Sequence, residues 1–300
     1  MRGRVFSLPL GQARVFGSDG AFYTCHLRSK VKSGENKVLV GDEVEFDPAQ
    51  TVVLSIYPRK NELVRPRVSN IDQIVICLTV EPAADLAMVD KLIIAAEQKK
   101  ITPIICVTKR DKTGENYVDE IHAQYQPIGV RVVSVSSVTG ENVDEIRGLF
   151  ENKITVLAGQ SGVGKSTLIN ALDDSLNLKT GELTKIARGK NTTTGSEIFS
   201  LSGGLVLDTA GFSVFDLAGL GAQDFLMAYP DIYKFAGECD YKSCNHLNKT
   251  VDECGVLRAL EEGKINRARF DRFLATYQRL AGLKPKYEKQ NKSKRGNKNV

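Results

Sequence analysis

Residues 159–166 have the sequence Gly-Gln-Ser-Gly-Val-Gly-Lys-Ser, which fits the pattern G-x-x-x-x-G-K-[ST]. An apolar run precedes this stretch at 154–158, and a segment with helical spacing follows it at 165–172. The glycines let the backbone curl so that its N–H groups face a phosphate, and the helix start adds partial positive charge. A strand before and a helix after are the context that the pattern requires, so the stretch predicts a phosphate-binding loop.

The side chains of this loop have separate expected roles. Lys165 is predicted to reach the β- and γ-phosphates of a nucleotide, and Ser166 is predicted to ligate Mg²⁺. The residues predicted to bind the nucleotide here are Gly159, Gln160, Ser161, Gly162, Val163, Gly164, Lys165, Ser166 and Thr167.

The segments around the loop alternate between buried strands and helices. Unbroken apolar runs at 71–80 and 101–108 flank a stretch with helical spacing at 86–99. Further strands are expected at 130–135 and 205–207, and a further helix at 143–150. This alternation predicts a doubly wound α/β sheet with parallel strands.

Two motifs after the loop are candidates for sensing the γ-phosphate. Asp208-Thr209-Ala210-Gly211 follows the apolar strand, so Asp208 could hold Mg²⁺ through water and Gly211 could bring a backbone N–H to the γ-phosphate. Residues 188–194 read Arg-Gly-Lys-Asn-Thr-Thr-Thr, and a Thr hydroxyl in such a loop can join Mg²⁺ while the γ-phosphate is present. Each motif alone is an ordinary turn or polar loop, and the phosphate loop favours the functional interpretation.

These motifs give the predicted catalytic set and the predicted magnesium ligands. Thr193 is favoured among the three threonines as the ligand of the mobile loop. The predicted catalytic residues are Lys165, Ser166, Thr193, Asp208 and Gly211, of which Ser166, Thr193 and Asp208 are the predicted ligands of Mg²⁺.

A candidate base selector lies earlier in the chain. Thr108-Lys109-Arg110-Asp111 follows a predicted strand and resembles the N-K-x-D motif of guanine-nucleotide proteins. The Asp111 carboxylate can accept hydrogen bonds from N1–H and the N2 amino group of guanine, whereas adenine offers neither donor. Ser136 and Ser137, after the strand at 130–135, are predicted to support the guanine through their backbone.

Composition and charge limit the class of protein. The 300 residues are 42% hydrophobic and 26% charged, which is ordinary for globular chains and excludes bulk disorder and fibrous classes. No apolar run approaches the roughly 18 residues of a membrane span, and the first residues lack the apolar core of a signal peptide. The expectation is therefore a cytoplasmic protein that does not enter a membrane.

The two ends of the chain differ from the middle. Residues 1–68 carry a net charge of +4, residues 69–220 carry −5, and residues 221–300 carry +6. Basic ends suggest a polyanionic partner such as the phosphate backbone of structured RNA. Five short apolar runs in the first part, at 4–8, 13–16, 22–27, 38–46 and 51–57, predict a small barrel of the oligonucleotide-binding (OB) type.

The C-terminal part contains a cluster of metal-binding residue types. Cys239-x4-Cys244-x-His246-x7-Cys254 offers three thiolates and one imidazole, the set for a closed tetrahedral Zn²⁺ site. No additional polar position is evident for catalysis, so one structural Zn²⁺ is predicted. Cys25, Cys77 and Cys106 stand singly in apolar stretches and are expected to be buried core thiols.

The order of these motifs carries a resemblance to a known family. Base selector, base support, phosphate loop, Thr loop and D-x-x-G form a circular permutation of the usual GTPase order. With a barrel before and a Cys/His cluster after, the chain resembles the ribosome small subunit-dependent GTPase family (RsgA, also called YjeQ) over about residues 3–280. Further points of resemblance are Val40-Gly41-Asp42-Glu43-Val44, Arg65-Pro66 and Asn70-Ile71-Asp72.

This resemblance implies a multidomain protein with GTP phosphohydrolase activity. It implies an OB-fold barrel over 1–68, a circularly permuted P-loop GTPase domain over 69–220 and a mainly helical zinc domain over 221–283, and a basic disordered tail is expected over 284–300. The implied ligands are GTP or GDP, Mg²⁺ and one Zn²⁺. The implied partner is the small ribosomal subunit with its rRNA, bound by a monomer during late maturation and stimulating hydrolysis.

The chain departs from the family pattern at several positions. Thr108 replaces the usual Asn, and its shorter hydroxyl cannot reproduce every amide contact. Asn191 and Gly195 lie where relatives often carry His, and Phe212 lies where many GTPases carry a water-orienting Gln. Slow intrinsic hydrolysis is therefore expected, with the missing electrostatic help supplied by a partner. The gap before Cys254 is also two residues longer than the family spacing.

Two other functions are compatible with the same motifs. One is a nucleotide-gated RNA-binding scaffold whose hydrolysis is incidental, and the other is an ATP-dependent phosphoryl-transfer enzyme. Loss of maturation activity in Lys165→Ala or Thr193→Ala would separate a switch from a scaffold. Selective loss of GTP binding in Asp111→Asn would separate GTP from ATP chemistry.

Overall fold

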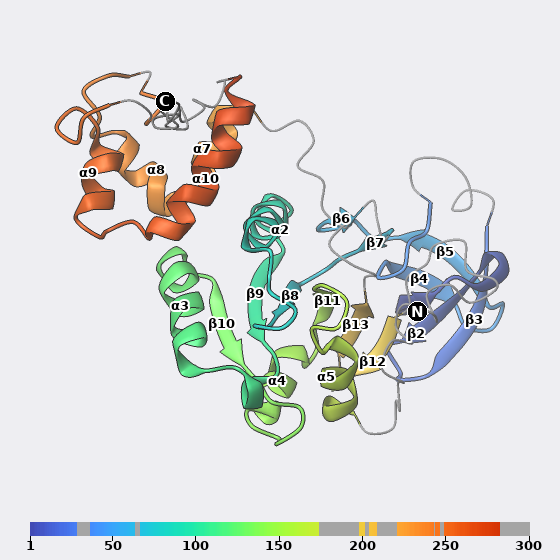
Figure 1. Ribbon diagram of the computed structural model, residues 1–300. Helices are drawn as coiled ribbons and strands as arrows, with labels where there is room; N and C mark the ends of the chain where they lie inside the picture. Colours follow the sequence, from blue (N-terminus) through green and yellow to red (C-terminus); the bar gives the residue numbers. More distant parts are fainter. Residues whose placement is uncertain are drawn as a thin grey trace, which may run out of the picture. The chain divides into compact units, whose positions relative to one another are not determined.

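The computed structural model describes residues 1–28, 37–63, 67–173, 198–201, 204–208, 221–242, 244–246 and 249–282 (Figure 1). The chain divides into two compact units, Met1–Ala218 and Gly219–Val300. Within the described ranges, no helix is both long enough and apolar enough to cross a membrane. The domain limits expected from the sequence stay a prediction.

The first unit begins with a closed five-stranded barrel. Its strands, in the order β1-β2-β3-β5-β4, are β1 (Arg2–Ser7), β2 (Gln12–Gly17), β3 (Phe22–Leu27), β5 (Val52–Ile56) and β4 (Glu43–Asp47). Strands β3 and β5 run parallel, and the other pairs are antiparallel. Alternate residues such as Val5, Val15 and Phe46 fill the interior, as expected for strands with one buried face. The predicted OB-like barrel is confirmed.

A network of buried polar groups joins the barrel to the segment that follows it. Gly41 has φ +88°, and a Cβ there would clash with the carbonyl oxygen of Ser69. The buried Asp42 carboxylate accepts hydrogen bonds from Ser69 Oγ (2.6 Å) and Arg59 Nε (2.7 Å). Asn70 Nδ2 donates to the Gly41 carbonyl oxygen at 3.1 Å. The two sequence motifs around residues 41 and 70 therefore meet in space.

Two short strands lie in the chain between the barrel and the sheet. Strands β6 (Glu62–Leu63) and β7 (Val68–Ser69) pair antiparallel, and Val68 also bridges Val40. Strand β4 begins at Glu43 rather than Val38, because the Asp42 N–H turns back to the Leu39 carbonyl oxygen before the strand begins.

A six-stranded sheet in the order β10-β9-β8-β11-β13-β12 forms the rest of the first unit. Its strands are β8 (Gln73–Leu78), β9 (Thr102–Val107), β10 (Arg131–Ser134), β11 (Ile154–Ala158), β12 (Ile198–Leu201) and β13 (Gly204–Asp208). The pairs from β10 to β13 are parallel, as predicted. The edge strand β12 is antiparallel to β13, because a two-residue connection is too short for a crossover helix.

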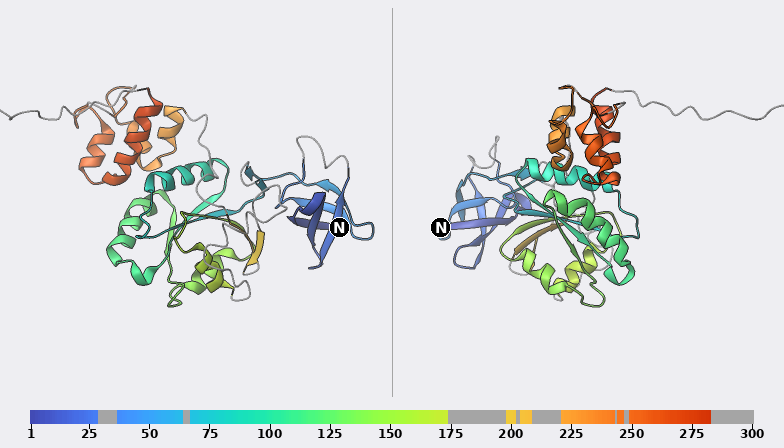
Figure 2. Two further views of the ribbon diagram at one scale, coloured as in Figure 1. Left: turned by 45° about the vertical axis from the view of Figure 1, so that its right-hand side comes forward. Right: turned by 90° about the vertical axis from the view of Figure 1, so that its left-hand side faces the viewer.

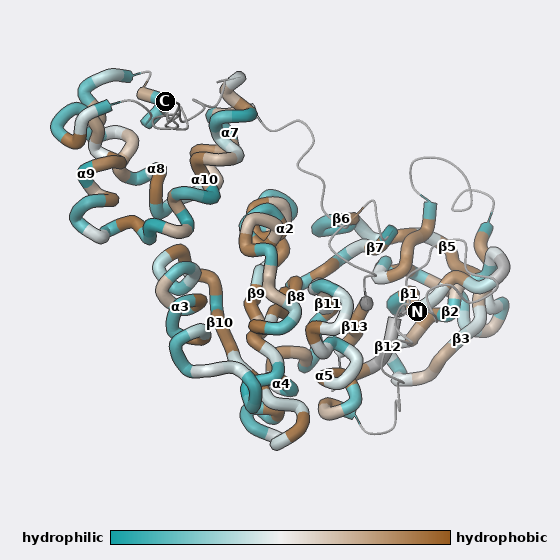
Figure 3. The backbone as a smooth tube through the Cα atoms, viewed as in Figure 1, coloured by the Kyte–Doolittle hydropathy of each residue, from teal (hydrophilic) through white to brown (hydrophobic). Residues whose placement is uncertain are grey.

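Helices cover both faces of the sheet (Figure 2). Helices α2 (Leu86–Gln98) and α3 (Glu115–Tyr125) pack on one face, and α4 (Val143–Phe150) and α5 (Lys165–Leu172) pack on the other. Figure 3 shows hydrophobic residues concentrated along the central strands, which are buried on both sides. The doubly wound fold is confirmed, with α3 and β12 added to the elements predicted from sequence.

The second unit is mainly helical. Its helices are α7 (Ala222–Met227), α8 (Pro230–Ala236), α9 (Gly255–Glu261) and α10 (Arg267–Leu280). Phe225, Tyr229 and Phe273 pack with ring centroids 5.1–5.9 Å apart. Beside them, the Arg269 guanidinium is buried and pairs with Asp231 at 2.8 Å. The expected helical C-terminal region is confirmed.

Candidate functional site

The predicted nucleotide-binding residues gather at the carboxyl edge of the sheet. Thr108 directly follows β9, Ser136 is the second residue after β10, and Gly159 directly follows β11. Parallel strands end on the same edge, which is where ligands bind in open α/β sheets. Strand β13 pairs with β11 so that Asp208 lies opposite Leu157, which brings the predicted magnesium ligand to this edge.

The phosphate loop has the backbone that its glycines allow. Gly164 has φ +104°, a conformation that residues with side chains rarely adopt, and it is the N-cap of α5. Lys165 Nζ lies over the loop and donates to the carbonyl oxygens of Gly159 (2.7 Å) and Gln160 (3.2 Å). Val163 is buried and anchors the loop, whereas Ser161 and Gly162 are exposed. This arrangement places an ammonium group and a helix start at one anion-binding position.

Thr108 ties the base-selecting segment to the phosphate loop. Its buried hydroxyl lies within hydrogen-bonding distance of the carbonyl oxygens of Val163 and Leu78. This link had no local sequence signal, because Val163 lies 55 residues further along the chain. The hydroxyl therefore makes a contact across the site even though it is shorter than an Asn amide.

Asp111 is held in place by the neighbouring strand end. Ser136 Oγ donates to Asp111 Oδ1 at 2.6 Å, and this hydrogen bond holds the pKa of the Asp111 carboxyl below its usual range. Ser136 Oγ in turn accepts from the Thr139 N–H at 3.2 Å. Asp111 is exposed and Ser137 is half-buried beside this pair, so an ionised carboxylate faces the solvent side of the sheet edge.

The two basic residues between Thr108 and Asp111 have protein partners of their own. Lys109 has φ +54°, and its Nζ donates to the Glu81 carbonyl oxygen at 2.9 Å. The Arg110 guanidinium donates to Glu115 Oε1 at 2.7 Å and to the Thr113 carbonyl oxygen at 2.8 Å. The Glu81 contact was not predicted from sequence, although its position just after β8 places it at the same sheet edge.

Several predicted site residues lie outside the described residues. Thr193 and Gly211 are among them, as are the departures from the family pattern at Asn191, Gly195 and Phe212. Ser166 and Thr167 lie in the first turn of α5 and are half-buried.

The second unit contains a cluster of three cysteines and one histidine. The ligand atoms of Cys239, Cys244, His246 and Cys254 all lie within 4.8 Å of one another. Cys254 Sγ is 3.8 Å from the sulfur atoms of both other cysteines and 3.5 Å from His246 Nδ1. Zn–S bonds of about 2.3 Å and Zn–N bonds of about 2.0 Å place tetrahedral sulfur atoms about 3.8 Å apart and nitrogen about 3.5 Å from sulfur. The spacing is therefore compatible with zinc.

The longer sequence gap before Cys254 does not displace it from this cluster. Cys254 is the N-cap of α9, and the Asp240 N–H donates to the Glu253 carbonyl oxygen at 3.1 Å, so the intervening residues turn back toward Cys239. Burial raises the pKa of the Cys254 thiol to about 12, a cost that a bound cation would offset by stabilising the thiolate.

Comparison with known proteins gives a consistent result over nearly the whole chain. The RsgA GTPase family model matches residues 56–218. A small ribosomal subunit biogenesis GTPase RsgA of Agathobacter rectalis is 37% identical over 277 residues, covering 90% of this chain and 91% of the relative. The protein of the same name from Bacillus cereus is 35% identical over 271 residues, covering 88% and 92%.

Solved structures agree with these relatives. The crystal structure of YjeQ from Thermotoga maritima superposes with a TM-score of 0.78 at 29% identity, covering 94% of this chain and 99% of that one. YloQ, described as a circularly permuted GTPase, superposes with a TM-score of 0.74 at 27% identity, covering 95% and 96%. The permuted motif order, the sheet-edge site and these similarities together show that the chain belongs to the RsgA GTPase family.

Proposed function

We propose that this protein binds the small ribosomal subunit and hydrolyses GTP during the late maturation of that subunit. The bound subunit stimulates the hydrolysis. The observation that carries the guanine part of this proposal is the Ser136–Asp111 hydrogen bond at the sheet edge. It keeps the Asp111 carboxylate ionised and oriented, so that the carboxylate can accept from N1–H and the N2 amino group of guanine. Adenine has no such donors, which disfavours the ATP-dependent alternative.

The phosphate loop supplies the groups that hold the triphosphate. Lys165 reaches toward the β- and γ-phosphates, and the N–H groups at the start of α5 contribute partial positive charge. Ser166, Asp208 and Thr193 would hold Mg²⁺, which neutralises charge on the β- and γ-phosphate oxygens when bound. Gly211 would bring its backbone N–H to the γ-phosphate, so loss of that group releases the adjoining segment.

Intrinsic hydrolysis is slow in this proposal. Residues 191, 195 and 212 are Asn, Gly and Phe, and none of these offers the imidazole or the glutamine amide expected there to orient an attacking water. The ribosomal subunit would supply or position the missing group, as partners do in other GTPases. GTP hydrolysis would then be fast only while the protein is bound to the subunit.

The cysteine cluster and the basic ends support the ribosomal partner. Cys239, Cys244, His246 and Cys254 would hold one structural Zn²⁺, which links distant segments of a small helical unit. The basic residues of α10 and the barrel suit phosphate contacts with rRNA. The protein would act as a monomer in the cytoplasm, where its substrate particle is assembled.

Phosphate release from GTP tests the proposal directly. The purified protein is assayed alone and with purified small subunits, with ATP as the nucleotide control and Lys165→Ala as the inactive control. A large rise that requires both subunits and GTP is the expected result. Rapid turnover without subunits, or no rise with them, would contradict the partner-dependent site. Subunit maturation that is fully supported by Lys165→Ala would favour the scaffold instead.

A further inference from the structure

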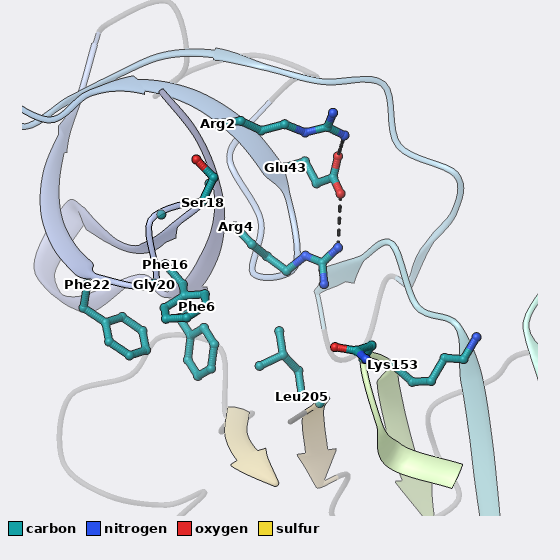
Figure 4. Close-up of a pocket in the computed structure, with 14 residues that line it drawn as sticks. Arg2, Arg4, Phe6, Phe16, Ser18, Gly20, Phe22, Glu43, Lys153 and Leu205 are labelled. Carbon is teal, nitrogen blue, oxygen red and sulfur yellow. Dashed lines mark hydrogen bonds and ion pairs between the residues drawn. The ribbon is translucent and has the colours of Figure 1, made fainter. Parts of the chain in front are cut away.

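A cavity of about 610 Å³ opens within the first unit, on the side of the sheet opposite the nucleotide edge. Its walls come from β1–β4 of the barrel, from the two residues just before β11 and from the first residues of β13 (Figure 4). The residues that matter for its chemistry are Phe6, Phe16, Phe22, Arg2, Arg4 and Lys153. None of them contributes to the GTP site described above.

One wall of this cavity is aromatic. Phe16 and Phe22 remain 39% and 44% exposed, although their rings are large and apolar. Their centroids are 4.9 Å apart, and Phe6 meets Phe22 edge-on at 5.1 Å. The barrel core is filled by other side chains, so these rings are not needed to close it. Exposed clusters of apolar side chains such as this one are typical of binding sites.

The opposite wall is cationic. Arg2 and Arg4 both pair with the single carboxylate of Glu43, which leaves the group with net positive charge. Arg4 Nε has no hydrogen-bond acceptor among the described residues. Lys153 also lines the cavity and is exposed, but in Figure 4 its side chain points away from the two arginines and the rings. Three cations against one anion give this lining a charge of +2.

We propose that this cavity binds one unpaired nucleotide of an RNA strand. The Arg14 guanidinium lies 4.2 Å from the centroid of the Phe22 ring and covers one of its faces. The base would stack on Phe16 and on the other face of Phe22, and its phosphates would lie against Arg2 and Arg4. Aromatic rings accept any base because every base has a π-face, and cations track the backbone. The rings lie on β2 and β3, the part of an OB barrel suited to oligonucleotides. The inference rests on the proposed function, because the RNA would belong to the ribosomal subunit.

The charge of the lining distinguishes this occupant from others. A neutral apolar peptide would leave the net positive charge of the lining without a counter-charge, and a second copy of the same positive face would be repelled. An RNA strand satisfies both walls at once.

Binding of short RNA to the full-length protein tests the inference. The probes are a fluorescently labelled hexauridylate and an abasic strand of the same length and charge, measured by anisotropy. Phe16→Ala/Phe22→Ala is expected to weaken hexauridylate binding about tenfold and to leave the abasic strand unchanged. Phe22→Trp is expected to retain binding, which separates stacking from loss of fold. Tyr233→Ala, at a 42% exposed ring in the second unit, is the matched control.

Three results would overturn the assignment. One is that the wild type and the double variant bind hexauridylate with equal affinity. Another is that the double variant loses affinity equally for hexauridylate and for the abasic strand. The third is a dimer that the same substitutions dissociate, which would assign the cavity to a second copy. GTP affinity and subunit-stimulated hydrolysis are measured on the same proteins. If subunits stimulate hydrolysis but the protein binds hexauridylate no better than the abasic strand, only this inference is contradicted. If the protein prefers hexauridylate but subunits do not stimulate hydrolysis, only the proposed function is contradicted.

Discussion

The Thr108 hydroxyl donates a hydrogen bond to the Val163 carbonyl oxygen, so the segment that selects the base is fastened to the loop that holds the phosphates. Both groups are buried, and the second nearby acceptor, the Leu78 carbonyl oxygen, belongs to the strand between them. A nucleotide bound at this edge would contact both segments, so their relative position sets affinity for all guanine nucleotides.

Thr108→Val removes this hydrogen bond while keeping the shape of the side chain. Leaving a buried carbonyl without a donor costs about 1–3 kcal/mol, and part of this would appear as weaker binding. We expect GTP and GDP to lose affinity to the same extent, about tenfold, measured by fluorescent nucleotide titration. Thr102→Val, at the exposed opposite end of β9, is the control and should bind normally. A loss confined to GTP would contradict this explanation.

Asp111→Asn is expected to change base selection rather than phosphate binding. The amide can no longer accept from both guanine donors, so GTP affinity falls by at least about tenfold. Xanthosine triphosphate carries a carbonyl in place of the N2 amino group and should gain affinity, because the amide can donate to it. Competition binding measures both effects, and Asp119→Asn on the exposed face of α3 serves as control. Equal weakening of both nucleotides would show that Asp111 does not read the base.

The Ser136–Asp111 hydrogen bond predicts a pH dependence. It lowers the pKa of Asp111, so the carboxylate persists at pH values below the usual carboxyl range and is lost only when the pH falls through the depressed value. Ser136→Ala should raise this pKa toward its usual value, and the decline of nucleotide binding on acidification should begin at a higher pH. Titrations between about pH 2.5 and 5 follow the decline, and circular dichroism confirms that the fold is intact. Superimposable profiles would contradict the assignment.

The cysteine cluster predicts one zinc per chain. Cys254→Ser removes a sulfur that lies 3.5 Å from His246 Nδ1 and should abolish stoichiometric zinc, measured by atomic emission on the purified protein. Because metal binding supplies folding free energy in such units, α9 and α10 should exchange amide hydrogens faster. Cys25→Ala, in the barrel core, should retain zinc. Full zinc content in the Cys254 variant would place the metal elsewhere.

Because the Arg269–Asp231 pair is buried, substituting Arg269 should destabilise the second unit far more than substituting an arginine of an exposed pair. Arg269→Met leaves Asp231 buried without its partner and should destabilise the second unit by about 3 kcal/mol. Adding Asp231→Leu should recover most of this loss, because the buried charge is removed. Arg267→Met breaks an exposed pair with Asp271 and should cost less than about 1 kcal/mol. Hydrogen exchange in α8 and α10 reports these changes, and equal effects of the two arginine substitutions would contradict them.

Much of the fold followed from hydrophobic periodicity. Strands β8, β9 and β11 are buried on both faces and stand out as apolar runs. Helix α3 was not predicted because its composition is polar, although Val118, Ile121 and Tyr125 have helical spacing. The direction of β12 has no local signal, because it depends on which strand it pairs with.

The residues of the candidate site likewise fall into those that the sequence identifies and those whose contacts only the structure shows. The phosphate loop and the Cys/His cluster are contiguous or regularly spaced, so their residues could be named from sequence. The Thr108 contact with Val163 joins residues from different strands, and no periodicity reveals it. Phe16 and Phe22 resemble core residues in their alternating strands, and only the closed barrel shows that both rings face outward.

The strand order β10-β9-β8-β11-β13-β12 also bears on how the chain folds as it is synthesised. Translation makes β8 first, then adds β9 and β10 to one side of it, and later adds β11 and β13 to the other. No later strand has to insert into a pair that has already formed. The nascent half-sheet therefore presents the unpaired backbone edge of β8 until β11 arrives, and the gap from Ser134 to Ile154 corresponds to about 1 to 4 seconds of synthesis. A chaperone that guards this edge would have that interval in which to act.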